Sequence, residues 1–231
     1  MFIGHFGVAL AAKKAAHKVS LGTLILATSW IDLVWPIFLL LGIEHVRITP
    51  GDTAFTPLEF THYPYTHSLL NVIGWGLLLG GVYFVFKRSL RNAAVVGVVV
   101  VSHWVLDWLS HRPDLPLYPG SEPHGLGLWQ SVPATIAVEG SIFLVGVILY
   151  ARSTRAHDRV GLWSFWGLVA ALIFFYVMNI IGPPPPNEEA LGWFALAAWI
   201  FPVWGWWIDR HRSTVQTTTP GVGTRRSSLA H

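Results

Sequence analysis

Six stretches of this 231-residue chain are long and apolar enough to cross a membrane. A helix rises about 1.5 Å per residue, so about 20 apolar residues cross a hydrocarbon core of ~30 Å. The stretches cover roughly residues 20–41, 67–86, 92–111, 130–151, 160–181 and 190–208. Only 12% of the residues are charged, against roughly 25% in an average soluble domain. The sequence therefore predicts an all-α, polytopic transmembrane helical bundle.

The basic residues alternate between the connections that join these stretches. They gather in residues 13–18, 87–91 and 152–159 and again after residue 209, whereas the other connections contain only Arg47 and Arg112. Under the positive-inside rule, the basic connections and the C-terminal tail are expected in the cytoplasm. The excess of basic residues thus indicates topology, and no nucleic-acid partner is expected. The absence of cysteine excludes disulfides and thiolate ligands.

Residues 2–16 are a shorter apolar segment, with eleven uncharged residues between Met1 and Lys13. Two arrangements stay open. The segment crosses the membrane, giving seven spans with the N-terminus outside and the C-terminus inside, or it lies on the cytoplasmic surface and leaves six. We expect seven, because only a crossing segment brings His5 to the depth of the polar residues described next. Residues 1–209 then form one transmembrane domain, followed by a disordered cytoplasmic tail over residues 210–231.

The stretch SHWVLDWLSH, residues 102–111, places His103, Asp107 and His111 at four-residue intervals. On a helix these residues lie along one stripe. A charge inside a membrane costs at least ~2.5–3.5 kcal/mol and calls for a partner, yet no Lys or Arg lies at this depth. Zinc binds both imidazole nitrogen and carboxylate oxygen. The sequence thus predicts a divalent metal ion, zinc above others, with ligands among residues of matching depth: His5, Asp32, His67, His103, Asp107 and His111.

The same residues also have a plainer interpretation. A histidine near a helix end commonly packs at the membrane interface, and an isolated Asp in a span can be protonated or hydrogen-bonded to a neighbouring helix. The stripe of His103, Asp107 and His111 can equally form a hydrogen-bonded ladder without a metal. Pattern alone does not separate these alternatives.

Four short motifs resemble the YdjM-like family of membrane-bound metal-dependent hydrolases. They are GHFG at residues 4–7, Asp32 in the next span, Thr66-His67-Ser68 opening a helix, and HxxxD from His103 to Asp107. The resemblance covers roughly residues 1–112 and implies a multi-pass hydrolase of the cytoplasmic (inner) membrane. The HxxxD element is also similar to helical zinc phosphoesterases of the phospholipase C type, which implies a phosphoester substrate. In the family a basic residue and a glycine commonly precede THS, whereas this chain has YPY.

Three functions stay open, all with the lipid bilayer as surroundings. The first is a metal-dependent hydrolase at the outer membrane boundary, acting on a phosphoester or lipid-linked substrate, with Asp32, Asp107 or Glu139 as general base. The second is a proton- or cation-coupled transporter in which these three carboxylates form a path. The third is a non-catalytic membrane scaffold whose polar residues only fix helix packing. The sequence decides neither enzymatic activity nor oligomeric state.

Overall fold

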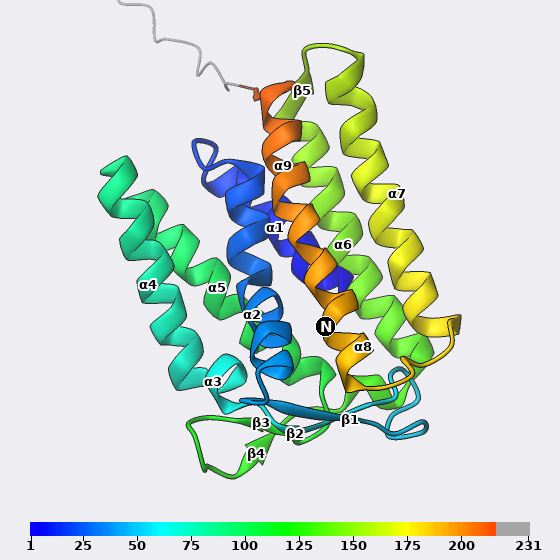
Figure 1. Cartoon of the computed structure of the whole chain (residues 1–231). Helices are drawn as coiled ribbons and strands as arrows, with labels where there is room; N and C mark the ends of the chain where they lie inside the picture. Colours follow the sequence, from blue (N-terminus) through cyan, green and yellow to red (C-terminus); the bar gives the residue numbers. More distant parts are fainter. Residues whose placement is uncertain (216–231) are drawn as a thin grey trace, which may run out of the picture.

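Six helical segments of 19 to 23 residues are long and apolar enough to cross a membrane in the computed structural model, which describes residues 1–215. Five are single helices: α2 (Leu21–Leu40), α4 (Leu69–Lys87), α5 (Leu90–Ser110), α6 (Val132–Ser153) and α7 (Arg159–Ile181). The sixth, Glu188–Arg210, consists of α8 (Glu188–Leu196), the 3-10 turn η2 (Ala197–Trp199) and α9 (Ile200–Arg210). Figure 1 shows these segments side by side, which confirms the predicted all-α bundle.

Each of these segments begins after a polar residue that caps it. The capping side chain accepts a hydrogen bond from the backbone N–H three residues further on, a group that no helical carbonyl can reach. The caps of α2, α4, α5, α6, α7 and α8 are Ser20, Ser68, Ser89, Ser131, Asp158 and Asn187. Short polar residues at the ends of apolar runs therefore determine where the spans begin.

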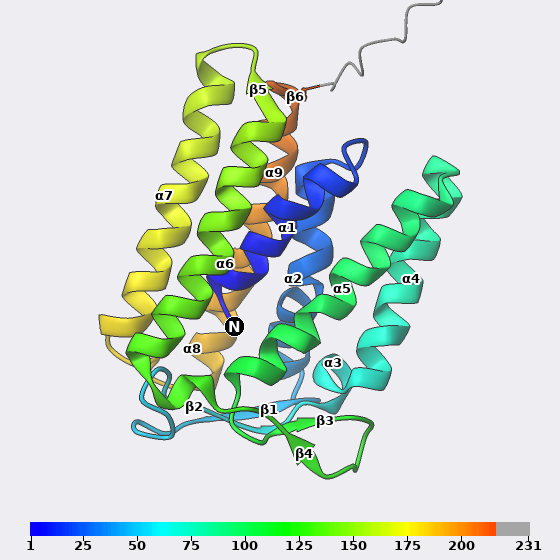
Figure 2. The ribbon, with the colours of Figure 1, turned by 180° about the vertical axis from the view of Figure 1, so that it is seen from behind.

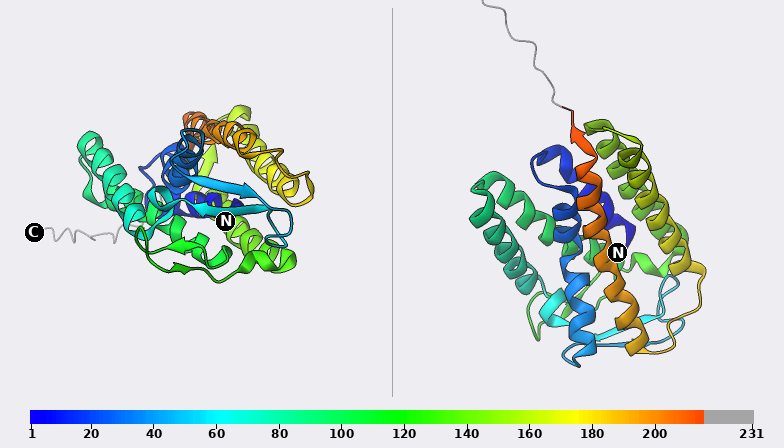
Figure 3. Two further views of the ribbon diagram at one scale, coloured as in Figure 1. Left: turned by 60° about the horizontal axis from the view of Figure 1, so that its bottom comes forward. Right: turned by 45° about the horizontal axis from the view of Figure 1, so that its top comes forward.

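One end of the bundle carries most of the irregular structure and is called the hairpin end below. Here β1 (His45–Ile48) pairs antiparallel with β2 (Leu58–His62), and β3 (Leu115–Pro116) with β4 (Pro123–His124). The short helix α3 (Pro64–His67) and the 3-10 turn η1 (Leu128–Gln130) lie at the same end. With this end turned forward (Figure 3, left), β1 and β2 lie across the bundle.

The opposite end, called the basic end, contains the basic connections over residues 13–18, 87–91 and 152–159 (Figure 2). The location of these basic connections at one end agrees with the alternation of basic and non-basic connections in the sequence. At this end β5 (Thr154–Ala156) pairs with β6 (Arg212–Thr214). The ordered chain thus continues beyond residue 210, where the tail was expected to begin, because the Arg212 side chain is buried against β5. Residues 216–231, the rest of the expected tail, lie outside the described residues.

Helix α1 (Ile3–Ala15) differs from the expected seventh span. Its 13 residues correspond to about 20 Å, too short for a ~30 Å core. The chain begins partway along the bundle and α1 runs from there to the basic end (Figures 1 and 2), so it neither crosses nor lies on the surface. It packs closely along α6, where a Cβ on Gly7 would meet the carbonyl oxygen of Ile142 at 2.6 Å. Six described segments, rather than seven, have the length to span.

Candidate metal centre

Four elements bring five of the predicted ligands into one cluster near the hairpin end. Helix α1 contributes His5, α2 contributes Asp32, α3 contributes His67, and α5 contributes His103 and Asp107. His5, His67, His103 and Asp107 are at most 3% exposed, whereas the Asp32 side chain is 43% exposed. The cluster is therefore buried within the bundle and accessible at Asp32.

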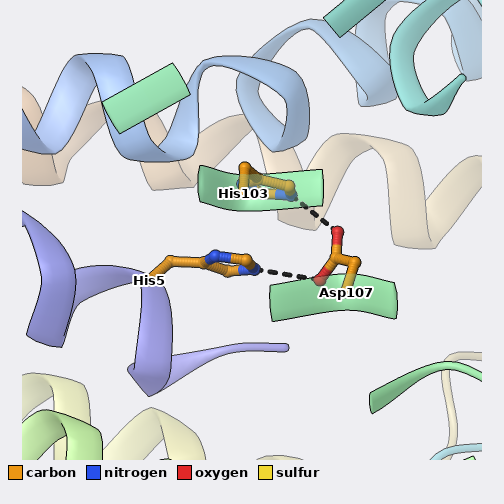
Figure 4. Close-up of side chains that lie close together, drawn as sticks. All are labelled: His5, His103 and Asp107. Carbon is orange, nitrogen blue, oxygen red and sulfur yellow. Dashed lines mark hydrogen bonds and ion pairs between the residues drawn. The ribbon is translucent and has the colours of Figure 1, made fainter. Parts of the chain in front are cut away.

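Asp107 lies at the centre of the cluster, and its two oxygens face different histidines. Oδ1 lies 3.1 Å from Nε2 of His5 and also contacts the amino group of Met1. Oδ2 lies 2.9 Å from Nε2 of His103 and 3.9 Å from Nε2 of His67. Figure 4 shows the carboxylate beside the edges of the His5 and His103 rings, with one oxygen toward each.

Asp32 faces the cluster from α2. Its Oδ1 lies 3.5 Å from Nε2 of His103 and 3.6 Å from Nε2 of His67. Two sets of three residues consequently have ligand atoms that all lie within 4.8 Å of one another, namely His5, His103 and Asp107, and Asp32, His67 and His103. The common depth inferred from the sequence thus corresponds to proximity in space. The role of these residues as ligands stays a prediction.

In His103 and His111, a hydrogen bond on the far side of the ring determines which nitrogen faces Asp107. Nδ1 of His103 lies 2.6 Å from the carbonyl oxygen of Thr28, which can only accept, so Nδ1 carries the hydrogen. Nδ1 of His111 likewise faces the carboxylate of Asp114 at 3.0 Å. Neutral forms of both rings therefore turn an Nε2 lone pair toward Asp107.

His67 is oriented by a longer chain of hydrogen bonds that starts at Glu44. The Thr66 hydroxyl donates to Oε2 of Glu44 at 2.6 Å, so its oxygen accepts from Nδ1 of His67 at 2.7 Å. Oε1 of Glu44 accepts from the backbone N–H groups of Tyr65 and Thr66 in α3. Glu44 is fully buried and caps the helix that carries His67. Sequence reasoning missed Glu44, although the threonine beside His67 marks a partner that such a carboxylate can use.

The centre of the cluster brings two carboxylates against several imidazole nitrogens, a set of groups that can bind a metal ion. Nε2 of His103 lies 2.9 Å from a carboxylate oxygen of Asp107 and 3.5 Å from one of Asp32. Lone pairs on His67 and His103, together with the carboxylates of Asp32 and Asp107, form the donor set that zinc prefers. Nδ1–H groups bonded to acceptors outside the site are also typical of metal-binding histidines. The residues present therefore fit a divalent metal ion.

His111 lies at the rim, outside both ligand sets. Its Nε2 is 4.0 Å from Oδ1 of Asp107, and its ring packs 4.1 Å from that of Trp129. The Tyr63 hydroxyl donates to the Asp114 carboxylate at 2.7 Å. Burial, with the neighbouring Asp114 charge adding to it, holds the pKa of Tyr63 well above its usual range, so this donor keeps its proton. The rim is thus a hydrogen-bonded cover over the cluster.

Glu139 of α6, expected as a catalytic carboxylate, has a different set of partners. Its Oε2 accepts hydrogen bonds from the backbone N–H groups of Phe2 at 2.8 Å and Gly4 at 3.4 Å. These groups belong to the first turn of α1, which no capping side chain of its own satisfies. Glu139 therefore holds the start of the helix that carries His5, and it belongs to neither ligand set.

Comparison with known proteins identifies one family. The model of the family described as YdjM inner membrane protein matches residues 1–182, more than half of the chain. No curated protein and no solved structure matches the chain.

Proposed function

We propose that this chain, which belongs to the YdjM inner membrane protein family, is a metal-dependent hydrolase with its site at the hairpin end of the bundle. Family membership makes it a multi-pass protein of the inner membrane. The proposal rests above all on His67 and His103, whose Nε2 lone pairs face two carboxylates. Such a centre is costly to bury without a cation.

The side chains fall into distinct roles under this proposal. His5, His67, His103, Asp32 and Asp107 would hold the metal, expected to be zinc. A divalent ion in such a site supplies a nucleophile at neutral pH and polarises the scissile group. Asp32, with 43% of its side chain exposed, is the carboxylate best placed to take a proton from water entering the site.

A pocket near α3, the helix that carries His67, supports a lipid or lipid-linked substrate. It has a volume of about 460 Å³ and lies between α2, α3 and α4. Its walls include Phe38, Trp75 and Leu78, and Tyr65 and Asn71 lie on either side of the Thr66-His67-Ser68 motif in the chain. An apolar pocket among membrane-spanning helices suits an acyl or prenyl chain.

The transport and scaffold alternatives have less support. A cation path was expected to use Glu139 together with Asp32 and Asp107, but Glu139 accepts hydrogen bonds from the first turn of α1. A scaffold that needs only packing gives no reason for two carboxylates and three histidines to converge in one cluster.

Metal analysis of the purified protein tests the proposal. Wild-type protein is expected to retain near-stoichiometric metal and to hydrolyse some members of a panel of phosphoesters presented in lipid micelles. His103→Ala should hold less metal than the wild type and lose the activity, because the residue belongs to both ligand sets. His45→Ala is the matched control, since His45 is an exposed histidine on β1. Wild-type protein that binds no metal after loading with zinc or manganese would overturn the proposal.

A further inference from the structure

We infer that the cluster holds two divalent ions side by side, bridged by the carboxylate of Asp107, and that its substrate is a phosphate ester. The inference rests on the proposed function and specifies it further. One ion belongs to His103, His67 and Asp32, and the other belongs to His5. The stacking of two histidine rings carries the argument.

The rings of His5 and His103 lie face to face. Their centroids are 3.7 Å apart and their planes differ by 3°. An imidazole binds a metal through a lone pair that lies in the ring plane, so one ion bound well by both rings would have to lie in both planes. Two nearly parallel planes at this separation do not share such a point. These two histidines therefore suit two different ions.

The ring separation also matches the spacing of known two-metal sites. Ions in such sites lie about 3.5–4 Å apart, close to the 3.7 Å between the stacked rings. Because Nδ1 of His103 is bonded to the Thr28 carbonyl, His103 has a single nitrogen to offer and can serve one ion only. Both ligand sets include His103, so only one of the two ions can use it and the other must be bound without it.

Asp107 supplies the bridge that such a pair needs. Its Oδ2 faces His103 and His67. Its Oδ1 faces His5 and the amino group of Met1, a cation already seated where the second ion would bind, with Nε2 of His111 on the same side at 4.0 Å. Asp32 adds an oxygen beside His103 and His67. One ion thus has two histidines and two carboxylates around it, and the other has His5, Asp107 and the approach of His111.

The charge of this site indicates the substrate class. Two divalent ions bring four positive charges, and Asp32 and Asp107 return two negative ones, which leaves an excess of positive charge inside a buried site. An anionic substrate balances that excess, and two-metal sites stabilise both oxygens of an in-line displacement. A phosphate ester meets both conditions. In its hydrolysis the water oxygen bonds to phosphorus, the ester P–O bond breaks, and the leaving oxygen gains the proton that the water loses.

Counting metal in single-histidine variants tests the inference. After loading with Mn²⁺ and gel filtration, the wild type is expected to hold two ions per chain, and His5→Ala and His67→Ala one each. His45→Ala should keep both ions. One ion in the wild type that persists in His5→Ala would overturn the two-ion site but leave the proposed function standing. No bound ion in the wild type would overturn both.

Paramagnetic resonance of the Mn²⁺-loaded wild type gives a second measurement that does not depend on the folding of any variant. Two ions bridged by one carboxylate should give the spectrum of a magnetically coupled pair, and His5→Gln should convert it to that of an isolated ion. A spectrum of isolated Mn²⁺ in fully loaded wild type would overturn the inference. Unchanged coupling in a monodisperse His5→Gln protein would exclude His5 as a ligand.

Discussion

At the basic end Lys13 donates to the carbonyl of Val19 at 2.8 Å and to Asp209 at 3.2 Å, whereas at the hairpin end three histidines turn lone pairs toward Asp107. Arg212 resembles Lys13, since it donates to Thr154 and to the carbonyl of Gly161 and lies over the ring of Phe165. Both ends bury ionisable groups. Donors meet acceptors at the basic end, whereas at the hairpin end the Asp107 carboxylate faces imidazole nitrogens as well as the amino group of Met1.

The two ends show two roles for a buried carboxylate. Asp209 accepts from Lys13 and from the backbone N–H of Leu21 at the start of α2, so its charge stabilises the joint between helices. Asp107 accepts from the amino group of Met1, but the rings of His103, His67 and His111 give their Nδ1 hydrogens to Thr28, Thr66 and Asp114 and not to Asp107. A carboxylate paired at a helix joint indicates structure, whereas a carboxylate that also faces several imidazole nitrogens indicates a site that can bind a metal ion.

Matched substitutions of the two carboxylates should give the largest contrast. Asp107→Asn is expected to reduce bound metal to less than about a tenth of the wild-type amount, because an amide is a poor ligand for a divalent ion. Its stability should fall as well, because the amino group of Met1 loses its buried carboxylate partner. Asp209→Asn should keep the metal and lose about 1–3 kcal/mol of stability. Metal analysis measures the bound metal, and denaturant unfolding in micelles measures the stability. Equal metal content in the two variants would contradict the distinction between the two carboxylates.

Lys13→Met should have an intermediate effect, confined to stability. The substitution leaves Asp209 without its cation in a largely buried position, at a cost of about 3 kcal/mol in the free energy of unfolding. Metal content should be unchanged, because Lys13 lies at the other end of the bundle. The double variant Lys13→Met/Asp209→Asn should recover part of the loss, since it removes both charges. Loss of metal in Lys13→Met with wild-type stability would show that the two ends are not independent.

Glu44→Gln should have the smallest effect and should be confined to metal affinity. The change turns a carboxylate that accepts from Thr66 into an amide that can donate to it, which frees the hydroxyl to point at Nδ1 of His67. A weakening of metal binding by about 10–100-fold is expected, as for other groups that orient metal-binding histidines. Competition with a metal chelator measures it. Glu59→Gln on β2 is the control, and equal effects of the two changes would rule out the orienting role.

Most of the fold follows from the sequence because the membrane imposes few solutions. Apolar runs of sufficient length and the alternation of basic connections predict the six long segments and their two ends. Small polar residues such as Ser68 and Ser131 mark where two of those helices begin. Helix α1 departs from the prediction because its length is insufficient for a span, while contact with α6 keeps it inside the bundle.

The sequence likewise predicted some residues of the candidate site and missed others. Depth along the helices was enough to group Asp32, His67, His103 and Asp107, because residues of one depth on adjacent helices meet. Depth did not distinguish Glu139, which lies deep in its span but accepts from the start of α1. It also gave no sign of Glu44, which lies in a connection between α2 and β1 and acts through Thr66.

By itself, then, the sequence determined that the chain is a polytopic helical membrane protein with an imidazole and carboxylate stripe, because hydropathy and helical periodicity are local properties. Only the tertiary structure decided which groups are paired, that α1 enters the bundle without crossing it, and that the His5 and His103 rings stack. Those outcomes depend on close approach between helices distant in the chain, where a single Cβ or one hydrogen-bond acceptor changes the result.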